Sequence, residues 1–234
     1  MSEEQQRGVA PHAEAPAETR ARARMVEAQI AGRGVRDPRV LRAMGEVPRH
    51  CFVPGAYHHL AYDDRPLPIA FEQTISQPYM VARATELAAP GAGDRALEIG
   101  AGSGYQTAVL SLLCAEVFAV EVIPELAAAA RVLLRDLGCD NVTLEAFDGS
   151  AGWPAHAPYD VIIVSAAAPR IPALLVDQLA EGGRLVLPVG GSNEDQILTC
   201  VRRRGSGYET TEDTRCRYVD LVGRYGVGSR PPEA

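Results

Sequence analysis

The sequence predicts an α/β fold: a mostly parallel, doubly wound β-sheet with antiparallel closing strands and an N-terminal helical extension. Three observations indicate it. Residues 94–105 read as a short buried strand that runs through a glycine-rich turn into a helix. Glu116–Glu121 reads as a second strand, which ends in an acidic residue. Tyr159–Val164 is an almost wholly apolar run with β-branched residues, which is typical of a central parallel strand buried on both faces.

The N-terminal part of the chain divides into a tail and the start of one domain. Residues 1–24 are rich in Ala, Glu, Pro and Arg and contain almost no large apolar residue, so we expect a mobile tail whose second half can become helical. Residues 25–234 show no internal repeat and no second core, and we expect them to form a single domain. Asp37 followed by Pro38 predicts a helix start, and this helix is expected to run to about Met44.

Two proline-bounded stretches precede the glycine-rich turn. Residues 47–54 are expected to be extended. Pro78 is expected to be the first residue of a helix, which places Ser76 and Gln77 at or just before its N-cap. A helix N-terminus offers unpaired N–H groups and a partial positive charge, so together with the Ser76 hydroxyl it can receive a carboxylate. The alternative is that Ser76 only caps the helix.

The elements after the glycine-rich turn complete the expected sheet. Pro124 opens a helix over residues 125–137, which Gly138 ends. The further elements expected are a strand at 142–145, a helix at 171–180 ended by Gly182 and Gly183, a strand at 184–189, and two closing strands at 196–202 and 217–222. A polar, Arg-rich stretch at 203–214 separates the two closing strands.

Composition restricts the class of protein and its partners. The 234 residues are 47% hydrophobic and 23% charged with a net charge of −7, which argues against a broad nucleic-acid-binding surface. No apolar run reaches membrane-spanning length, and the N-terminus lacks the basic and apolar regions of a secretory signal. Five scattered cysteines without a C-x-x-C pair predict reduced thiols and no metal site. We expect a cytoplasmic monomer with no nucleic-acid or membrane partner.

The glycine-rich turn is a candidate cofactor site, because only glycine lets a ligand lie against the backbone at such a turn. A pyrophosphate-binding fingerprint, G-x-G-x-x-G, would need glycine at position 105, where the chain has Tyr105. The observed G-x-G-x-G, preceded by an acidic residue, resembles instead the S-adenosyl-L-methionine loop of Rossmann-like class I methyltransferases. The candidate cofactor-binding residues of this stretch are Glu98, Gly100, Gly102, Ser103 and Gly104.

Two later positions are further candidates for cofactor binding. Glu121 lies 21 positions after Gly100, at the tip of the second strand. A carboxylate at about that distance normally accepts hydrogen bonds from ribose hydroxyls. Asp148 and Gly149 follow the end of the third strand, where an adenine could lie, and the alternative for this pair is a simple turn.

Five stretches carry a resemblance to a known family: PRHCFVP (48–54), QTISQP (73–78), LEIGAGSGY (97–105), YDVIIV (159–164) and GRLVLPVG (183–190). Over roughly residues 25–225 the chain resembles the protein-L-isoaspartate (D-aspartate) O-methyltransferase family. The glycine loop is shared by many methyltransferases, whereas the TISQP stretch upstream of it is far more specific.

The resemblance implies S-adenosyl-L-methionine as the cofactor and isoaspartyl-containing proteins and peptides as partners. Such an enzyme methylates the abnormal α-carboxyl of L-isoaspartyl and D-aspartyl residues. The ester then collapses to a succinimide, whose hydrolysis partly restores normal aspartate. Ser76 corresponds to the serine that the family assigns to the active site. The substrate-binding residues implied are Thr74, Ile75, Ser76, Val219 and Leu221.

The implied reaction needs little acid–base chemistry. Its nucleophile is a carboxylate, which is ionised near neutral pH because its reference pKa is about 4. The protein has to hold the oxygen, the methyl carbon and the sulfur in line, which is catalysis by orientation. Ser76 would orient the carboxylate through a hydrogen bond and form no covalent intermediate.

One departure from the family pattern keeps the substrate class open. Family members usually carry Val-Pro-Leu where this chain has Val219, Asp220 and Leu221. An acidic residue there would either repel a substrate carboxylate or point to solvent. Two alternatives therefore remain, a relative that methylates a carboxylate of a dedicated peptide or a small molecule, and a non-catalytic peptide-recognition module that kept the cofactor loop. Tyr105 argues against a nicotinamide dehydrogenase, and Ser-Ala-Ala-Ala at 165–168 against an amino-methylating nucleic-acid enzyme.

Overall fold

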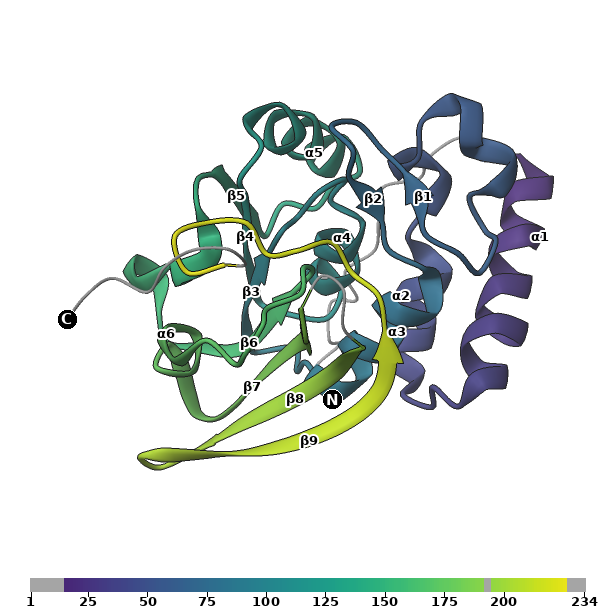
Figure 1. Ribbon diagram of the computed structural model, residues 1–234. Helices are drawn as coiled ribbons and strands as arrows, with labels where there is room; N and C mark the ends of the chain where they lie inside the picture. Colours follow the sequence, from purple (N-terminus) through teal and green to yellow (C-terminus); the bar gives the residue numbers. More distant parts are fainter. Residues whose placement is uncertain (1–14, 192–194, 227–234) are drawn as a thin grey trace, which may run out of the picture.

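The computed structural model describes residues 15–191 and 195–226. Its centre is a seven-stranded sheet in the order β5-β4-β3-β6-β7-β8-β9 (Figure 1). The strands are β3 (Arg95–Ile99), β4 (Glu116–Glu121), β5 (Val142–Ala146), β6 (Tyr159–Val164), β7 (Leu179–Val189), β8 (Gln196–Arg204) and β9 (Gly207–Cys216). The five strands from β5 to β7 run parallel, whereas β8 and β9 are antiparallel to their neighbours. The predicted mostly parallel sheet with antiparallel closing strands is confirmed.

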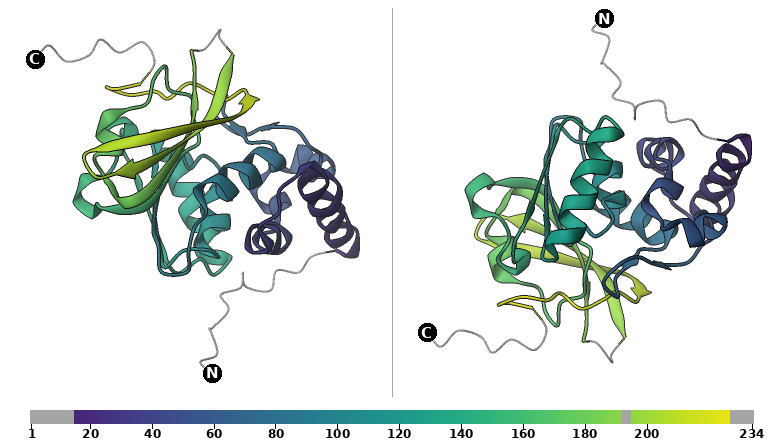
Figure 2. Two further views of the ribbon diagram at one scale, coloured as in Figure 1. Left: turned by 90° about the horizontal axis from the view of Figure 1, so that it is seen from below. Right: turned by 90° about the horizontal axis from the view of Figure 1, so that it is seen from above.

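The two faces of the sheet are covered differently. One face packs against the three longer helices that follow the N-terminal extension, α3 (Pro78–Ala88), α4 (Tyr105–Ser111) and α5 (Pro124–Asp136) (Figure 2). The other face packs against the short helix α6 (Ala173–Val176) and the side chains of Trp153 and Leu221. Because successive side chains of a strand point to opposite faces, Leu97 and Ile99 of β3 serve this second core.

The N-terminal extension is helical and lies to one side of the molecule (Figures 1 and 2). Its elements are α1 (Pro16–Arg24), a π-helical turn (Met25–Ile30), a 3₁₀ turn (Ala31–Arg33) and α2 (Pro38–Glu46). The predicted cap of α2 is confirmed, since the Asp37 side chain accepts a 2.8 Å hydrogen bond from the Arg39 N–H. Arg22 of α1 donates to the Gly45 carbonyl of α2 at 2.6 Å. The second half of the expected tail is therefore a docked helix, and residues 1–14 lie outside the described residues.

A two-stranded hairpin precedes α3 and lies against the glycine-rich turn. It consists of β1 (Leu67–Pro68) and β2 (Thr74–Ile75), paired antiparallel. Its turn places Phe71 and Glu72 at φ values of +58° and +57°, as in a type I′ hairpin turn. The Ile69 side chain lies 3.7 Å from the position that a Cβ on Gly102 would occupy. The hairpin thus delivers β2, and the residues after it, to the edge of the glycine-rich turn.

Two predicted elements are wrong, one before the parallel strands and one between β6 and β7. Residues 47–54 are not extended throughout, because Arg49–Phe52 forms a 3₁₀ helix whose Arg49, His50 and Phe52 side chains are buried. The helix expected at 171–180 is only the four-residue α6, and Gly182 and Gly183 lie inside β7 instead of ending a helix. The reason is tertiary: Leu179 pairs with Tyr159 of β6, and the Tyr159 N–H donates to the Gln178 carbonyl at 2.8 Å.

The last strand is also displaced from its predicted position. β9 spans Gly207–Cys216, which falls mostly in the polar stretch at 203–214 that was expected to separate the closing strands, and residues 217–222 leave the sheet. Most residues of β9 are exposed, so this edge strand lacks the apolar alternation by which strands are recognised. Of residues 217–222, Leu221 packs into the second core, and its N–H donates to the Ala167 carbonyl, just after β6, at 2.8 Å.

Candidate active site

The glycine-rich turn between β3 and α4 requires glycine for two reasons. Gly100, Gly102 and Gly104 have φ values of +84°, +53° and +88°, which other residues rarely adopt. At Gly104, a Cβ would also lie 3.3 Å from Ala130 and 3.2 Å from Leu134 of α5. The spacing recognised in the sequence therefore reflects both the backbone conformation of the turn and the close approach of a helix.

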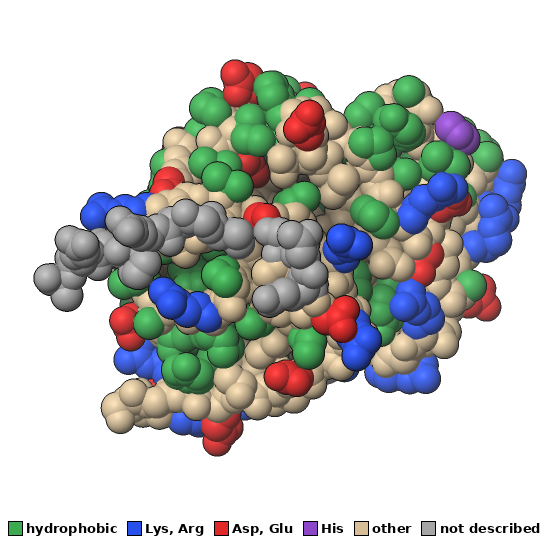
Figure 3. Space-filling model, in the orientation of Figure 1, with side chains coloured by type: hydrophobic (Ala, Val, Ile, Leu, Met, Phe, Trp, Pro, Cys, Tyr) green, Lys and Arg blue, Asp and Glu red, His purple; other side chains and the backbone are tan. Residues whose placement is uncertain are grey.

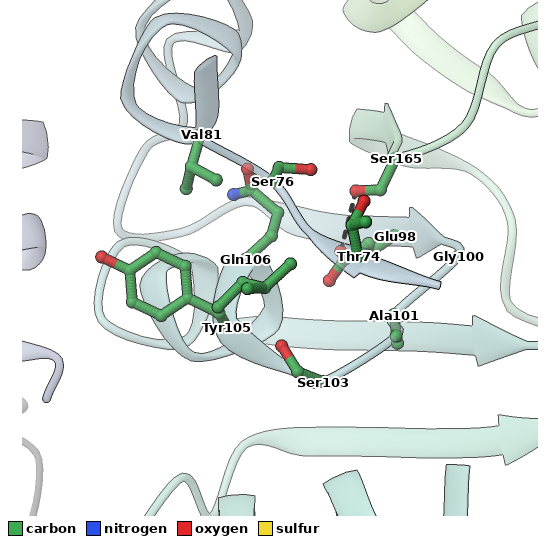
Figure 4. A pocket seen from close by; sticks show the side chains of 12 residues that line it. Thr74, Ser76, Val81, Glu98, Gly100, Ala101, Ser103, Tyr105, Gln106 and Ser165 are labelled. Atoms are coloured by element: carbon green, nitrogen blue, oxygen red, sulfur yellow. Dashed lines mark hydrogen bonds between the residues drawn. The ribbon is translucent and has the colours of Figure 1, made fainter. Parts of the chain in front are cut away.

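Two adjoining cavities lie beside this turn. The larger has a volume of about 200 Å³, and its wall includes Gly100, Gly102, Ile99, Val120, Glu121, Gly149, Val219, Asp220 and Leu221. The smaller, of about 30 Å³, is lined by Thr74, Ile75, Ser76, Glu98, Gly100, Gly102, Ser103 and Ser165 among others (Figure 4). Both cavities share four residues: Thr74, Gly100, Gly102 and Ser165. The structure thus brings the glycine turn, the TISQ stretch (residues 74–77) and the Val219–Leu221 stretch to one cleft.

Glu121 connects the tip of β4 to the glycine turn. One carboxylate oxygen accepts a 2.8 Å hydrogen bond from the Gly102 N–H, and the other accepts a 3.0 Å bond from the Ile123 N–H. The side chain is 5% exposed and lines the larger cavity. Because a carboxylate has about four acceptor positions, it can hold both N–H groups and still accept from a ligand hydroxyl.

Glu98 is buried beneath the cleft as a neutral acid. Its two oxygens accept hydrogen bonds from the Thr107 hydroxyl at 2.5 Å and the Ser165 hydroxyl at 3.0 Å. Burial raises the pKa of Glu98 to about 8, although the two hydroxyl bonds oppose the rise. The dashed line in Figure 4 marks its bond to Ser165. Glu98 therefore supports Ser165 from below and adds little negative charge to the cleft at neutral pH.

Ser76 faces the cleft and does not cap α3. The N-cap is Gln77, which makes no side-chain cap hydrogen bond, so the interpretation of Ser76 as a simple cap is wrong. Ser76 is half-buried and lines the smaller cavity together with Thr74 and Ile75 of β2. In Figure 4 the side chains of Thr74, Ser76 and Ser165 lie on one side of the glycine turn.

Tyr218 lies beside Ser76 without lining either cavity, and the sequence analysis missed it. Burial raises its pKa, and a hydrogen bond with the Ser76 side chain opposes the rise. Gln196 fixes the Tyr218 backbone, since its Oε1 accepts from the Tyr218 N–H at 2.6 Å and its Nε2 donates to the Tyr218 carbonyl at 3.2 Å. Position 218 directly precedes the Val219–Leu221 stretch, which was the available signal. Ser165 was also missed, and its place after the carboxyl end of a central strand was the signal there.

The remaining predicted positions divide between the cavity wall and its surroundings. Gly149 lines the larger cavity, and a Cβ there would lie 3.0 Å from Val120. Asp148 does not line this cavity. Its carboxylate accepts hydrogen bonds from the Ser150 N–H at 2.9 Å and from the Arg224 N–H at 2.8 Å. Asp220 is among the residues that line the larger cavity, between Val219 and Leu221.

The described residues contain no cluster of three or more His, Cys, Asp or Glu side chains that could hold a metal ion. The five cysteines, all within the described residues, form no disulfide bond. Within residues 15–191 and 195–226, no helix is long and apolar enough to span a membrane. On the face shown in Figure 3, basic and acidic side chains are both scattered and form no single basic field.

The parallel sheet, the glycine turn and the acidic tip of β4 together define a Rossmann-like class I methyltransferase. Residues 20–226 match the sequence profile of protein-L-isoaspartate (D-aspartate) O-methyltransferase. The chain belongs to this family.

Curated relatives cover nearly the whole chain. The chain is 54% identical over 205 residues to the protein-L-isoaspartate O-methyltransferase of Methanoregula boonei, an alignment that spans 88% of this chain and 94% of the relative. It is 51% identical over 210 residues to the enzyme of the same name from Geobacter metallireducens, which spans 89% and 97%.

Solved structures show the same fold. A protein-L-isoaspartate O-methyltransferase superposes with a TM-score of 0.79 at 28% identity, covering 88% of this chain and 67% of that chain. A Plasmodium falciparum protein described as a putative member, in complex with S-adenosyl-L-homocysteine, gives a TM-score of 0.75 at 24% identity and covers 86% and 98%.

Proposed function

We propose that this chain transfers a methyl group from S-adenosyl-L-methionine to the free α-carboxyl of L-isoaspartyl and D-aspartyl residues in damaged proteins and peptides. The observation that carries the proposal is the junction of the two cavities. A cofactor along the glycine turn would share Thr74, Gly100, Gly102 and Ser165 with whatever occupies the cavity that Ser76 lines. Donor and acceptor would therefore meet without a further rearrangement of the site.

The residues of the larger cavity fit this cofactor. Ile99, Val120 and Leu221 offer an apolar slot for a flat base, and Glu121 offers carboxylate oxygens at its edge for ribose hydroxyls. The cofactor, when bound, supplies an electrophilic methyl group on a sulfonium. The protein supplies the backbone of Gly100 and Gly102, against which a ligand can lie closely.

The acceptor side of the cleft needs a hydrogen-bond donor and no base. The substrate carboxylate is ionised at neutral pH, so the chain has only to hold one oxygen toward the cofactor. We assign this task to the Ser76 hydroxyl, with Thr74 and Ile75 forming the adjacent wall. Tyr218 lies beside Ser76 and interacts with its side chain. Val219 and Leu221, the other residues that the resemblance implies for substrate binding, line the larger cavity and not the one that Ser76 lines.

A narrower substrate is the second candidate, because Asp220 lines the larger cavity at a position where the family pattern usually has proline. In that case the chain would methylate a carboxylate of one dedicated peptide or of a small molecule. We also propose that the protein acts as a cytoplasmic monomer without a nucleic-acid partner. Its net charge of −7 and its five reduced cysteines, none in a disulfide in the described part of the chain, support this. Light scattering on the purified protein tests the monomer.

The deciding experiment is methyl transfer from radiolabelled S-adenosyl-L-methionine to an isoaspartyl peptide. The matched control is the same peptide with a normal aspartyl residue. We expect labelled ester only with the isoaspartyl peptide, followed by conversion of that peptide to the succinimide. Cofactor binding with no transfer to any isoaspartyl peptide would contradict the proposal and favour the narrower substrate.

A further inference from the structure

Arg49 is a fully buried cation at the back of the TISQ stretch. It opens the 3₁₀ helix Arg49–Phe52, and its side chain is 0% exposed. A buried charge is costly unless it is hydrogen-bonded, and buried ions are a weak source of stability. Two of its nitrogens bond backbone carbonyls: Nε donates to Ala61 at 2.8 Å and Nη2 donates to Ser76 at 2.8 Å. Within the described residues, the buried Nη1 has no hydrogen-bond partner.

The bond to Ser76 fixes the residue that faces the cleft. The Ser76 carbonyl belongs to the peptide plane that leads into Gln77, the N-cap of α3. Holding this oxygen sets the ψ angle of Ser76 and therefore the direction of its side chain. The neighbouring Gln77 side chain donates to the Asp64 carbonyl at 3.2 Å. Hydrogen bonds thus hold the connection between β2 and α3 at two consecutive residues, Ser76 and Gln77.

Arg49 also remains charged where it is buried. Burial lowers its pKa to about 10, which still leaves the guanidinium protonated at neutral pH. The guanidinium carbon of Arg49 lies 4.8 Å from the centre of the Tyr105 ring. Burial raises the pKa of the Tyr105 phenol, so this side chain is neutral. The cation therefore lies behind Ser76 without a phenolate to neutralise it.

We propose that Arg49 is a positioning residue, which holds the Ser76 backbone so that the Ser76 hydroxyl meets the substrate carboxylate. This inference rests on the proposed function. It predicts that loss of Arg49 impairs use of the isoaspartyl peptide and leaves cofactor binding in place, because neither of its two carbonyl bonds is made to the glycine turn.

Two substitutions separate positioning from folding. Arg49→Met keeps a side chain of similar length but removes the charge and both hydrogen bonds. Arg49→Lys keeps a charge but lacks the planar guanidinium that reaches two carbonyls. The matched control is Arg184→Met. Arg184 likewise donates to two backbone carbonyls, at Ala88 (2.7 Å) and Ala89 (2.8 Å), but at the far end of α3. For both Arg49 variants we expect kcat/KM for the isoaspartyl peptide to fall about ten-fold or more, with cofactor Kd and the control's kcat/KM within about two-fold of the parent.

A double-mutant cycle with Ser76→Ala tests whether Arg49 acts through Ser76. In that background Arg49→Lys should change kcat/KM by less than about two-fold, because the group it positions is already gone. Equal losses in both backgrounds would overturn the inference, as would Arg49 variants that match the Arg184 control. If Arg49→Met does not fold, the cycle with Arg49→Lys decides. An inactive parent enzyme would contradict the proposed function itself, which keeps the two failures distinct.

Discussion

The Gly102 N–H donates a 2.8 Å hydrogen bond to the Glu121 carboxylate, and this contact joins the glycine turn after β3 to the tip of β4. Two features recognised separately in the sequence are therefore one unit. The carboxylate orders the turn and lines the cavity at the same time. Removing it would affect both the shape of the turn and any ribose contact.

Glu121→Ala is expected to weaken binding of S-adenosyl-L-methionine and S-adenosyl-L-homocysteine by about 1.5–3 kcal/mol, because a charged hydrogen-bond partner is lost. Titration calorimetry measures this, and NAD should not bind. Glu145→Ala is the control, since Glu145 lies opposite Val120 on the neighbouring strand but is exposed and paired with Arg131. Undiminished affinity in folded Glu121→Ala would refute the role.

Ser76→Ala is expected to lower kcat/KM for the isoaspartyl peptide ten-fold or more, about 1.4 kcal/mol or above, because an orienting hydrogen bond is lost. Loss of a helix cap costs about 1 kcal/mol of stability. Because Gln77, and not Ser76, is the N-cap, Ser76→Ala should lower the free energy of unfolding by less than this amount. Melting, cofactor titration and methyl transfer on one preparation check this. A variant with normal turnover would remove Ser76 from the mechanism.

Asp220→Pro is expected to raise turnover on isoaspartyl peptides, because a carboxylate in the cavity wall repels a substrate carboxylate. Asp220→Asn removes the charge but keeps the backbone N–H, so it separates charge from ring geometry. Steady-state kinetics of both variants give KM and kcat. If neither constant changes in Asp220→Asn, the charge does not act on the substrate.

Glu98→Gln is expected to flatten the pH dependence of stability. The folded protein keeps the Glu98 proton up to about pH 8, whereas the unfolded chain loses it near the ordinary pKa of 4.5. The stability that this group contributes is complete below about pH 4.5 and is lost as the pH rises through 8. The glutamine resembles the protonated acid, so its advantage should grow by up to about 1.4 kcal/mol per pH unit across that window.

Urea unfolding at several pH values measures this difference. Glu116→Gln is the control, because Glu116 is exposed and paired with Arg95 at the other end of the neighbouring strand. Parallel stability profiles for the parent and Glu98→Gln would show that Glu98 is ionised in the folded protein.

The sequence by itself determined the features that local pattern encodes. Three such features are each contiguous in the sequence: the strand, glycine turn and helix of residues 94–111, the acidic end of β4, and the buried run of β6. In each of them the residue types follow from the local backbone conformation. The family resemblance at Thr74–Ile75 and Ser76 likewise lies in one short stretch, and all three residues line the smaller cavity.

Only the tertiary structure decided which distant residues meet at Ser76. Arg49 reads in the sequence like any surface arginine, yet it is buried because its carbonyl partners come from segments 12 and 27 residues away. Tyr218 reaches Ser76 because the chain leaves the sheet after β9, and β9 itself went unrecognised because an exposed edge strand has no apolar alternation. Hydrogen bonds between segments far apart in the chain leave no periodic trace in the sequence, so these contacts appear only once the chain has folded.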